Sequence, residues 1–330
     1  MLHGRKRATL ALTAAATIVC VALVPMSPSS AEPDIDVVKV KVDRLYEKAE
    51  HAQERLNDAR VRLADVTKEL DALRADQARQ QDRVDAVRTQ VSGSIVDQYQ
   101  GESISAVGQV VVSDDPAAFL EQLTTMSAFN DMQSEMFGDY AKELKALNIR
   151  KEETNRRVAE AEALQKQLTA EKATVDENYD RAKGMLDDLE EEQQAAILEA
   201  SRSGDVSRLP DVEASGRAAA AVQYAMAQVG KSYVYGAAGP SAFDCSGLTM
   251  MAWAQAGVGL PHSSSAQFSS GPRISESDLQ PGDLVFYYSP ISHVGMYIGN
   301  GLIVNAENPS AGVKVTGLHA MPYVGAVRPG

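Results

Sequence analysis

Cysteine is almost absent from this chain, with two residues, Cys20 and Cys245, among 330. So little cysteine excludes a disulfide framework, and stability must therefore come from packing. Positive charge is also in deficit, because 45 acidic residues outnumber 32 lysines and arginines and leave a formal net charge of −13. That balance argues against binding to nucleic acid, which requires a basic surface.

Long apolar runs are missing as well, apart from one at the N-terminus. Residues 5–7 are basic, residues 8–24 are mostly apolar, and small residues end at Ala31. This order predicts a secretory signal peptide over residues 1–31, and hence a secreted protein that works outside the cytoplasm, at the cell wall. Its removal takes away Cys20 and three positive charges, which shifts the net charge from −13 to −16. An uncleaved membrane anchor is the alternative, because the run approaches the length of a short transmembrane helix.

Two heptad series follow the N-terminal segment. Apolar residues alternate spacings of three and four, with charged residues on the flanks, which predicts coiled-coil helices. The two series are nearly equal in length, so residues 35–200 are predicted to form an antiparallel helical hairpin. A parallel dimer is the alternative, since Gln, Lys and Thr at seam positions weaken the seam. The first series includes Val38, Val42, Leu45, Ala49, Ala52, Leu56, Ala59, Leu63, Val66, Leu70 and Leu73, and the second includes Tyr140, Leu144, Leu147, Val158, Ala161, Leu168, Val175, Tyr179, Ala182, Leu186 and Leu189.

The heptads are interrupted between the two series. Gly101 and Pro116 punctuate residues 93–137, which are predicted to form a small lobe at the tip of the hairpin. The apolar and methionine side chains of this segment predict either packing of the lobe on itself or docking of a partner. After the second series, residues 201–216 have no period and many polar or breaking residues. They indicate a linker before a C-terminal domain at residues 217–330.

The C-terminal domain holds the residues with recognisable chemistry. Cys245 follows Asp244 and precedes an apolar run at residues 248–255 that predicts a buried helix. Cys245 therefore falls at a helix N-terminus, where unpaired N–H groups and the dipole favour a thiolate, and Asp244 is a natural N-cap. His293, 48 residues further on, is the candidate base. On spacing alone, a small buried cysteine without chemistry is an equal alternative.

A third polar residue is needed to orient the imidazole of His293. An apolar segment that begins at His293 and a second one at residues 302–306 predict two strands joined by a turn at residues 299–301. A two-residue turn puts Asn305 on the opposite face from His293, whereas a three-residue turn with a left-handed glycine puts both on one face. Glu307 shares that face. We predict Asn305 as the orienting residue, with Glu307 as the rival.

Five segments of this domain resemble the NlpC/P60 cysteine peptidases, which have a papain-like core and cleave peptidoglycan stem peptides. The resemblance implies an α+β fold, with Cys245 as nucleophile and His293 as base. It also implies that Tyr233, twelve residues before the cysteine, lies near the nucleophile. The family often has a histidine where this chain has Asn305. The matching segments cover residues 230–236, 243–248, 260–267, 279–286 and 292–299.

The same resemblance implies a substrate and its contacts. It implies cleavage of the amide between D-isoglutamate and the diamino acid of a stem peptide through a thioester, with Asp244, Ser246 and Ser264 against the substrate. A role for Asp244 as helix cap alone is an equal alternative. The whole arrangement resembles the Rip-type peptidoglycan endopeptidases of actinobacteria. It also resembles coiled-coil regulators of wall hydrolases, whose tips bind a transporter-like membrane complex of the division machinery.

Cofactors are not implied by any motif. The residues Cys245, His262, His293 and His319 lack the spacing of metal ligands, so no metal site is predicted. Two other function classes stay open: a wall or division adaptor with a silent peptidase domain, and an acyltransferase that uses the same thioester chemistry. The acidic coiled coil is predicted to fold over the groove and to restrain the enzyme until the tip binds a partner.

Overall fold

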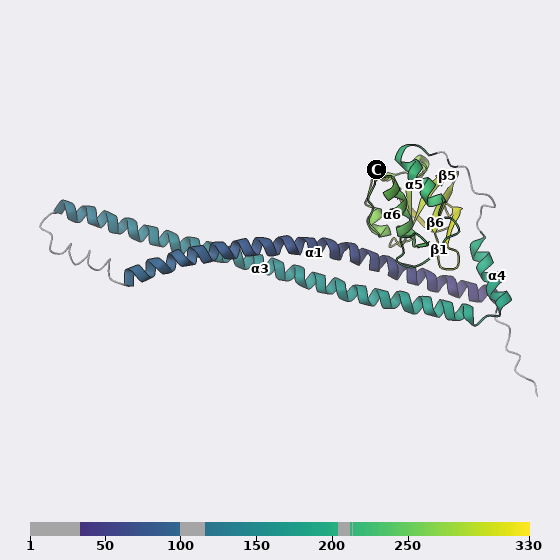
Figure 1. Cartoon of the computed structure of the whole chain (residues 1–330), viewed down its shortest axis with the longest axis horizontal. Coiled ribbons are helices and arrows are strands. Elements are labelled where there is room, and N and C mark those ends of the chain that lie inside the picture. The colour runs from purple at the N-terminus through teal and green to yellow at the C-terminus, as the bar shows by residue number, and fades with distance from the viewer. Residues whose placement is uncertain (1–33, 100–115, 204–211, 213) are drawn as a thin grey trace, which may run out of the picture.

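The chain divides into a long helical arm and a C-terminal α+β domain (Figure 1). The computed structural model describes residues 34–99, 116–203, 212 and 214–330. The signal peptide predicted for residues 1–31 lies outside the described residues. None of the described helices is long and apolar enough to cross a membrane.

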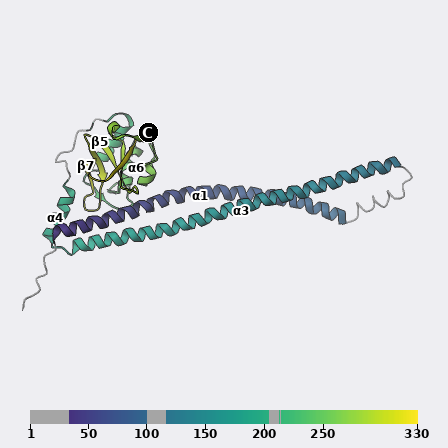
Figure 2. The ribbon, with the colours of Figure 1, turned by 180° about the vertical axis from the view of Figure 1, so that it is seen from behind.

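Two long helices form the arm. Helix α1 (Ile35–Tyr99) and helix α3 (Pro116–Asp187) lie side by side in opposite directions, as both views show (Figures 1 and 2). Helix α4 (Glu191–Arg202) packs at the base of the arm, beside the start of α1. The predicted antiparallel hairpin is thereby confirmed, because α1 finds its coiled-coil partner within the same chain.

Apolar side chains from the two heptad series fill the seam between α1 and α3. Near the base of the arm, Val42 and Leu45 of α1 pack with Ala182 and Leu186 of α3 and with Ile197 of α4. A second cluster lies further along the arm and consists of Ala59, Val66 and Leu164. Residues at heptad positions are therefore buried along much of the arm, as a heptad pattern requires, although the predicted seam residues Leu144 and Tyr179 of α3 are each 37% exposed.

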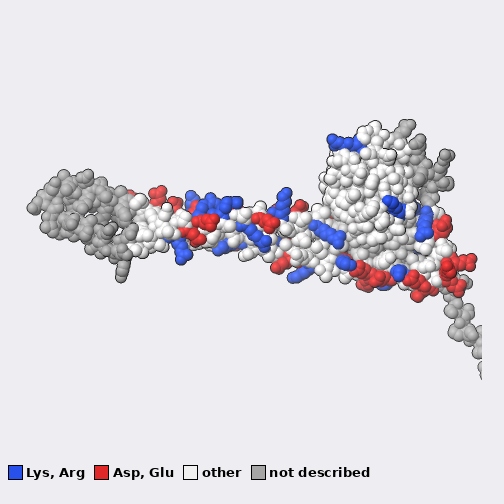
Figure 3. Space-filling view, in the orientation of Figure 1, with Lys and Arg blue, Asp and Glu red and all other residues white. Residues whose placement is uncertain are grey.

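Charged side chains on the flanks pair across the seam. Arg55 donates to both carboxylate oxygens of Glu171 at 2.9 and 2.8 Å, and Arg150 Nε donates to Asp76 at 2.6 Å. The partner number on α3 falls as the number on α1 rises, which is the signature of antiparallel pairing. Exposed pairs of this kind contribute at most about 1 kcal/mol each, so their main effect is on register. Figure 3 shows both signs of charge interspersed along the arm.

The helices extend further toward the tip than the sequence indicated. Within the range 93–137, predicted as a small lobe, residues 93–99 continue α1 and residues 116–137 belong to α3. Gly93 lies within α1 although glycine costs about 1 kcal/mol in a helix, because that cost is small beside a 65-residue helix that is already propagated. Residues 100–115 lie outside the described part of the chain.

The C-terminal domain contains a six-stranded antiparallel sheet with the strand order β3-β8-β4-β5-β6-β7, and a separate parallel pair β1-β2. The helices are α5 (Gly216–Met226), α6 (Cys245–Gln255), the single turn α7 (Ser264–Gln267) and the 3-10 turn η1 (Glu276–Asp278). The strands are β1 (Ser232–Tyr233), β2 (Ala242–Phe243), β3 (Arg273–Ile274), β4 (Leu284–Tyr287), β5 (His293–Gly299), β6 (Leu302–Ala306), β7 (Val313–Gly317) and β8 (Tyr323–Val327).

The domain has a hydrophobic core of its own. Helices α5 and α6 pack against one face of the sheet, where Leu248 and Trp253 meet Phe286 and Met296. All residues of this core cluster come from residue 212 onwards, so the described part of the arm contributes none of them. The predicted α+β fold is confirmed, and this core allows the domain to be considered as an independent folding unit.

The domain sits on the basal half of the arm, with α1 passing directly beneath it (Figures 1 and 2). Helix α1 contacts α7 and β5. The Tyr235 hydroxyl donates to the backbone carbonyl of Tyr46 in α1 at 3.1 Å. Lys314 Nζ donates to the backbone carbonyl of Ser201 in α4 at 2.9 Å. Helices α1 and α4 therefore both contact the domain at the base of the arm. The boundaries predicted at residues 201–216 stay a prediction.

Candidate active site

Cys245 is the first residue of α6. Asp244 caps this helix by accepting from the Gly247 N–H at 2.6 Å, and it also accepts from the Gly236 N–H at 2.9 Å. Gly247 has no room for a side chain, because a Cβ there would lie 2.3 Å from the Ala237 carbonyl oxygen. The N-cap and the missing side chain together let the chain turn sharply into α6, and the Cys245 thiol lies at the helix start.

Asp244 is committed to the fold. Its carboxylate is fully buried and pairs with His262 Nε2 at 2.8 Å in addition to its helix-capping contacts. Burial opposes a charge on His262, but the hydrogen bond to Asp244 and the charges of Asp244 and Glu54 together outweigh it and raise the pKa of the imidazole. Of the two roles considered for Asp244, these contacts support the helix cap.

His293 begins β5 and Asn305 lies on the neighbouring strand β6. His293 Nε2 lies 3.1 Å from Asn305 Oδ1. The Asn305 amide nitrogen donates to Thr316 Oγ1 at 3.0 Å, which turns the amide oxygen toward the imidazole. The arrangement holds the proton of the imidazole on Nε2 and leaves Nδ1 for chemistry.

The turn between β5 and β6 decides this contact. Met296 pairs with Val304 and Tyr297 pairs with Ile303, so paired residue numbers have an even sum, and the register shifts only next to the turn. Gly299, Asn300 and Gly301 all have positive φ, which is the left-handed backbone of a bulged turn. The turn therefore places Asn305 on the same face as His293. The rival Glu307 forms an ion pair with Lys314 at 3.3 Å instead.

A residue from the arm reaches the imidazole. Glu50 of α1 places Oε1 2.5 Å from His293 Nδ1. One carboxylate oxygen of Glu50, the Cys245 sulfur and a ring nitrogen of His293 all lie within 4.8 Å of one another, and all three residues are buried. The structure thus brings the predicted nucleophile and base together, and it adds a carboxylate that the sequence analysis did not predict.

Glu54, one helical turn further along α1, occupies the groove beside the cysteine. Its Oε1 accepts from Ser246 Oγ at 2.8 Å and lies 3.7 Å from the Cys245 sulfur. Its Oε2 accepts from the Ser264 N–H at 2.5 Å and from Ser264 Oγ at 2.7 Å. The side chain is 2% exposed. Ser246 and Ser264, which the sequence analysis assigned to substrate, thus both hold a carboxylate of the chain's own arm.

Asp58 continues the same row of carboxylates. It accepts from Ser265 Oγ at 2.6 Å and from Ser263 Oγ. Residues 50, 54 and 58 are four apart, so their side chains lie on one face of α1, and that face is turned toward the domain. The other face of α1 carries the seam with α3.

Electrostatics in this covered site disfavour the reactive thiolate. Burial and the nearby carboxylates of Glu54, Glu50 and Asp244 raise the pKa of the Cys245 thiol well above its usual value. Burial also raises the pKa of Glu54 to about 7, with a contribution from Asp244. Burial opposes a charge on His293, but Glu50 outweighs it and raises the pKa of the imidazole. With α1 in place, the thiolate of Cys245 is disfavoured and the charged form of the His293 imidazole is favoured.

Tyr233 belongs to the same buried cluster as Cys245, and its predicted role beside the nucleophile stays a prediction. It is 4% exposed, and its hydroxyl oxygen has no hydrogen-bond partner among the described residues. Burial raises the pKa of this hydroxyl well above its usual value, with further contributions from Glu50 and Cys245. A buried, unpaired hydroxyl beside a nucleophile is suited to donate to a bound ligand.

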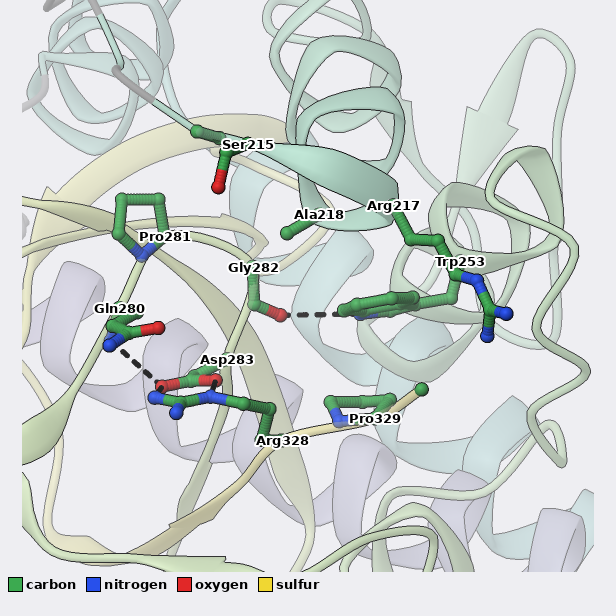
Figure 4. A pocket seen from close by; sticks show the side chains of 12 residues that line it. Ser215, Arg217, Ala218, Trp253, Gln280, Pro281, Gly282, Asp283, Arg328 and Pro329 are labelled. Atoms are coloured by element: carbon green, nitrogen blue, oxygen red, sulfur yellow. Dashed lines mark hydrogen bonds and ion pairs between the residues drawn. The ribbon is translucent and has the colours of Figure 1, made fainter.

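A cavity of about 590 Å³ lies in the C-terminal domain, apart from this site (Figure 4). Neither Cys245 nor His293 lines it. Asp283 accepts two hydrogen bonds from Arg328, both at 2.7 Å, and the Trp253 indole donates to the Gly282 carbonyl at 3.2 Å. These contacts join α6 and Arg328 to the two residues that precede β4, so the cavity is framed by structural contacts.

Sequence reasoning missed Glu50, Glu54 and Asp58. In a heptad reading they are flank residues, and charged flank residues are ordinarily solvated. The available signal was weak. It consisted of three acidic residues spaced by four, which places their side chains on one face of the helix. What covers that face depends on the placement of the C-terminal domain, which the pattern of α1 does not encode.

Comparison with known proteins agrees with this geometry. Residues 230–325 match the model of the NlpC/P60 family. A protein of Mycobacterium tuberculosis named "Probable endopeptidase" is 48% identical over 115 residues, which cover 34% of this chain and 30% of that protein. A "Probable endopeptidase" of Corynebacterium glutamicum is 45% identical over 109 residues, which cover 33% of this chain and 52% of that protein. The chain thus spans about a third to a half of the length of these relatives.

A search of solved structures also finds a partial match. The structure of the resuscitation promoting factor interacting protein RipA is 31% identical to the matched part, covers 38% of this chain and 69% of that chain, and has a TM-score of 0.33. Cys245 and His293 both fall within residues 230–325, which match the family model, as a cysteine-type peptidase requires.

Proposed function

Because residues 230–325 form an NlpC/P60 domain, we propose that this chain is a peptidoglycan endopeptidase of the cysteine type. The observation that carries the proposal is the contact of His293 Nε2 with Asn305 Oδ1, at 3.1 Å, next to a thiol at the start of a helix. Nucleophile, base and orienting amide have the relationship that acyl transfer through a thioester requires. The protein acts outside the cytoplasm, where residues 1–31 direct it.

The mechanism follows from the positions of the donors. With α1 moved away, Nδ1 of His293 takes the proton of the Cys245 thiol, and the thiolate attacks the carbonyl of the amide. The N–H groups at the start of α6 stabilise the oxyanion. The imidazolium then gives its proton to the leaving amine, a thioester remains on Cys245, and water attacks it with His293 as base. Asn305 keeps the imidazole in one tautomer throughout.

The bond we propose is the amide between D-isoglutamate and diaminopimelate in a stem peptide. The support is the resemblance of the domain together with two hydroxyl groups in the groove. Ser246 and Ser264 bind the carboxylate of Glu54 in the structure, and the same donors suit a carboxylate of a stem peptide. Tyr233 supplies a further unpaired hydroxyl.

The described state is the restrained form of this enzyme in our proposal. Glu50 occupies Nδ1 of His293, which the thiol must reach, and Glu54 fills the groove between Cys245, Ser246 and Ser264. A substrate and these two side chains exclude each other. The arm therefore inhibits by occupying the site, and its removal exposes a complete set of catalytic groups.

Release is proposed to begin at the far end of the arm. Exposed apolar side chains occur there among the described residues, namely Ile95, Val96, Met132 and Phe137. Apolar side chains in that position suit a protein partner more than water. The partner we propose is a membrane complex of the division machinery, in keeping with a role in wall remodelling or in the separation of daughter cells.

The test compares three proteins on purified peptidoglycan, with released peptides identified by mass spectrometry. These are the mature chain, its Cys245→Ala variant, and residues 217–330. We expect the short protein to release dipeptide-bearing fragments faster than the mature chain, and the alanine variant to release none. Equal rates for the short and the mature protein would remove the case for restraint by the arm. Continued cleavage by the alanine variant would reject Cys245 as nucleophile.

One observation favours a second candidate function. The site is covered by α1 in the described state, so the chain as it stands is a silent peptidase joined to an arm, which is the form of an adaptor. If neither the mature chain nor residues 217–330 releases fragments, the adaptor function becomes the better supported of the two. Transfer of the acyl group to an added amine, detected in the same spectra, would indicate an acyltransferase instead.

A further inference from the structure

Three buried donors from three elements meet where the arm covers the dyad. Glu50 comes from α1, Cys245 from α6 and His293 from β5, and their ligand atoms all lie within 4.8 Å of one another. Since Nε2 of His293 faces Asn305, Nδ1 is the nitrogen turned toward Glu50. The sequence shows no metal-ligand spacing around Cys245 because the third donor lies 195 positions earlier, in a different domain.

The donor set has a definite metal preference. Thiolate, imidazole and a single carboxylate form the kind of mixed set that zinc accepts, at ligand distances of about 2.0–2.3 Å. Donors around one zinc ion lie roughly 3–4 Å apart, so small side-chain shifts bring these three into range. Calcium and magnesium require many oxygen ligands, and a site with one carboxylate does not suit them.

The charge around the site also favours a cation. Glu50, Glu54 and Asp244 are all buried, and within the described ranges none of them forms an ion pair with a lysine or arginine. Only the imidazoles of His262 and His293 face them at ion-pair distance. Buried negative charge of this kind is costly unless a cation compensates it.

Tyr233 belongs to the same buried cluster as Cys245, and its hydroxyl has no hydrogen-bond partner among the described residues. Zinc sites with three protein ligands carry water in the fourth position. Such a water would give this hydroxyl the partner that the described residues do not supply.

We propose that the covered site binds one zinc-class divalent cation between Glu50, Cys245 and His293, and that the ion clamps the arm over the groove. Binding displaces the protons on the Cys245 sulfur and on Nδ1 of His293, and Glu50 binds as the carboxylate. Two ligands belong to the domain and one to the arm, so the ion binds the closed form more tightly than the open form and stabilises it. The clamp rests on the restrained state of the proposed function.

Cobalt(II) is the probe that tests the site, because a bound thiolate gives a charge-transfer band in the near ultraviolet. The metal-free mature chain is titrated with cobalt(II), and zinc is then added in competition. We expect one cobalt per chain with a thiolate band that zinc removes, and no band in Cys245→Ala. Glu50→Gln keeps a hydrogen-bonding side chain beside His293 but weakens zinc binding at least about tenfold. Glu47→Gln on the same helix is the matched control and binds as the unaltered chain does.

Two outcomes overturn the site: a mature chain without the thiolate band, or equal zinc affinities for Glu50→Gln and the unaltered chain. Thermal unfolding of each variant without metal establishes that it is folded. Binding is read from spectra that need no turnover, so a failure of residues 217–330 to cleave peptidoglycan rejects the proposed function without affecting this result. If the mature chain cleaves equally well with and without saturating zinc, the ion does not clamp the arm over the groove. That outcome rejects the clamp but leaves the zinc site standing.

Discussion

At the scale of single residues, each catalytic group is held by a neighbour with a separate structural task. Asp244 fixes the start of α6 beneath Cys245, and Thr316 fixes the amide of Asn305 against His293. These supports lie within the domain and do not depend on the arm. The arm acts on the same groups from outside, through Glu50 and Glu54. Mutations can therefore separate the positioning of the proposed catalytic groups from their proposed restraint by the arm.

Asn305→Ala in residues 217–330 removes the acceptor for Nε2 of His293. We expect kcat to fall by about 10²-fold, with little change in KM, because the imidazole loses its fixed tautomer and orientation while the groove is unchanged. Steady-state rates on a soluble stem-peptide substrate measure both constants. Thr316→Val, which frees the amide without removing it, should give a smaller loss. A rate for Asn305→Ala equal to that of the unaltered domain would point to Glu307 or to another orienting residue.

The contact between His293 and Asn305 was within reach of the sequence, whereas the contact with Glu50 was not. Strand alternation and turn type are local properties. Together they leave two positions for Asn305, on the same face of the sheet as His293 or on the opposite one, and the bulged turn gives the same face. Glu50 has the same local pattern as any acidic residue on a coiled-coil flank. Its role depends on how two separately folded units dock, and that is a property of surfaces far apart in the chain.

At the scale of elements, α1 is a helix with two buried faces. Its apolar face packs on α3. Its acidic face contacts the domain, where Glu54 accepts hydrogen bonds from both Ser246 and Ser264. The heptad pattern predicted the first face because apolar periodicity is strong. It passed over the second because buried carboxylates require partners that only the other unit provides.

Glu54→Ala in the mature chain is expected to raise the rate of peptidoglycan cleavage by about tenfold or more. The substitution removes the Glu54 acceptor from the two serine hydroxyls and from the Ser264 N–H in the closed form, and hydrogen bonds to charged groups are worth about 1.5–3 kcal/mol each. Every tenfold shift toward the open form corresponds to about 1.4 kcal/mol. The same measurement on Glu47→Gln, an exposed position of α1, should show no change. An unaltered rate in Glu54→Ala would mean that Glu50 and the rest of the interface hold the arm without this residue.

At the scale of the whole molecule, the arm and the domain are joined as parts of one chain, and this connection strengthens their contact. Linked partners meet at an effective concentration that free partners reach only at millimolar levels. The arm pairs with itself, since α1 and α3 bury each other's apolar face. The contacts behind the proposed restraint therefore all lie within one chain.

Separation of the two units provides the last prediction. Residues 34–203 added in excess to residues 217–330 should inhibit cleavage, because the acidic face of α1 and the groove are complete in the two pieces. Inhibition should require a concentration far above that of the enzyme, since the advantage of the covalent linker is lost. Residues 34–203 carrying Glu54→Ala should inhibit more weakly, and the hairpin should be monomeric by light scattering. A hairpin that dimerises in parallel, or one that never inhibits at any concentration, would show that the chain restrains itself by another route than the contact between Glu50, Glu54 and the groove.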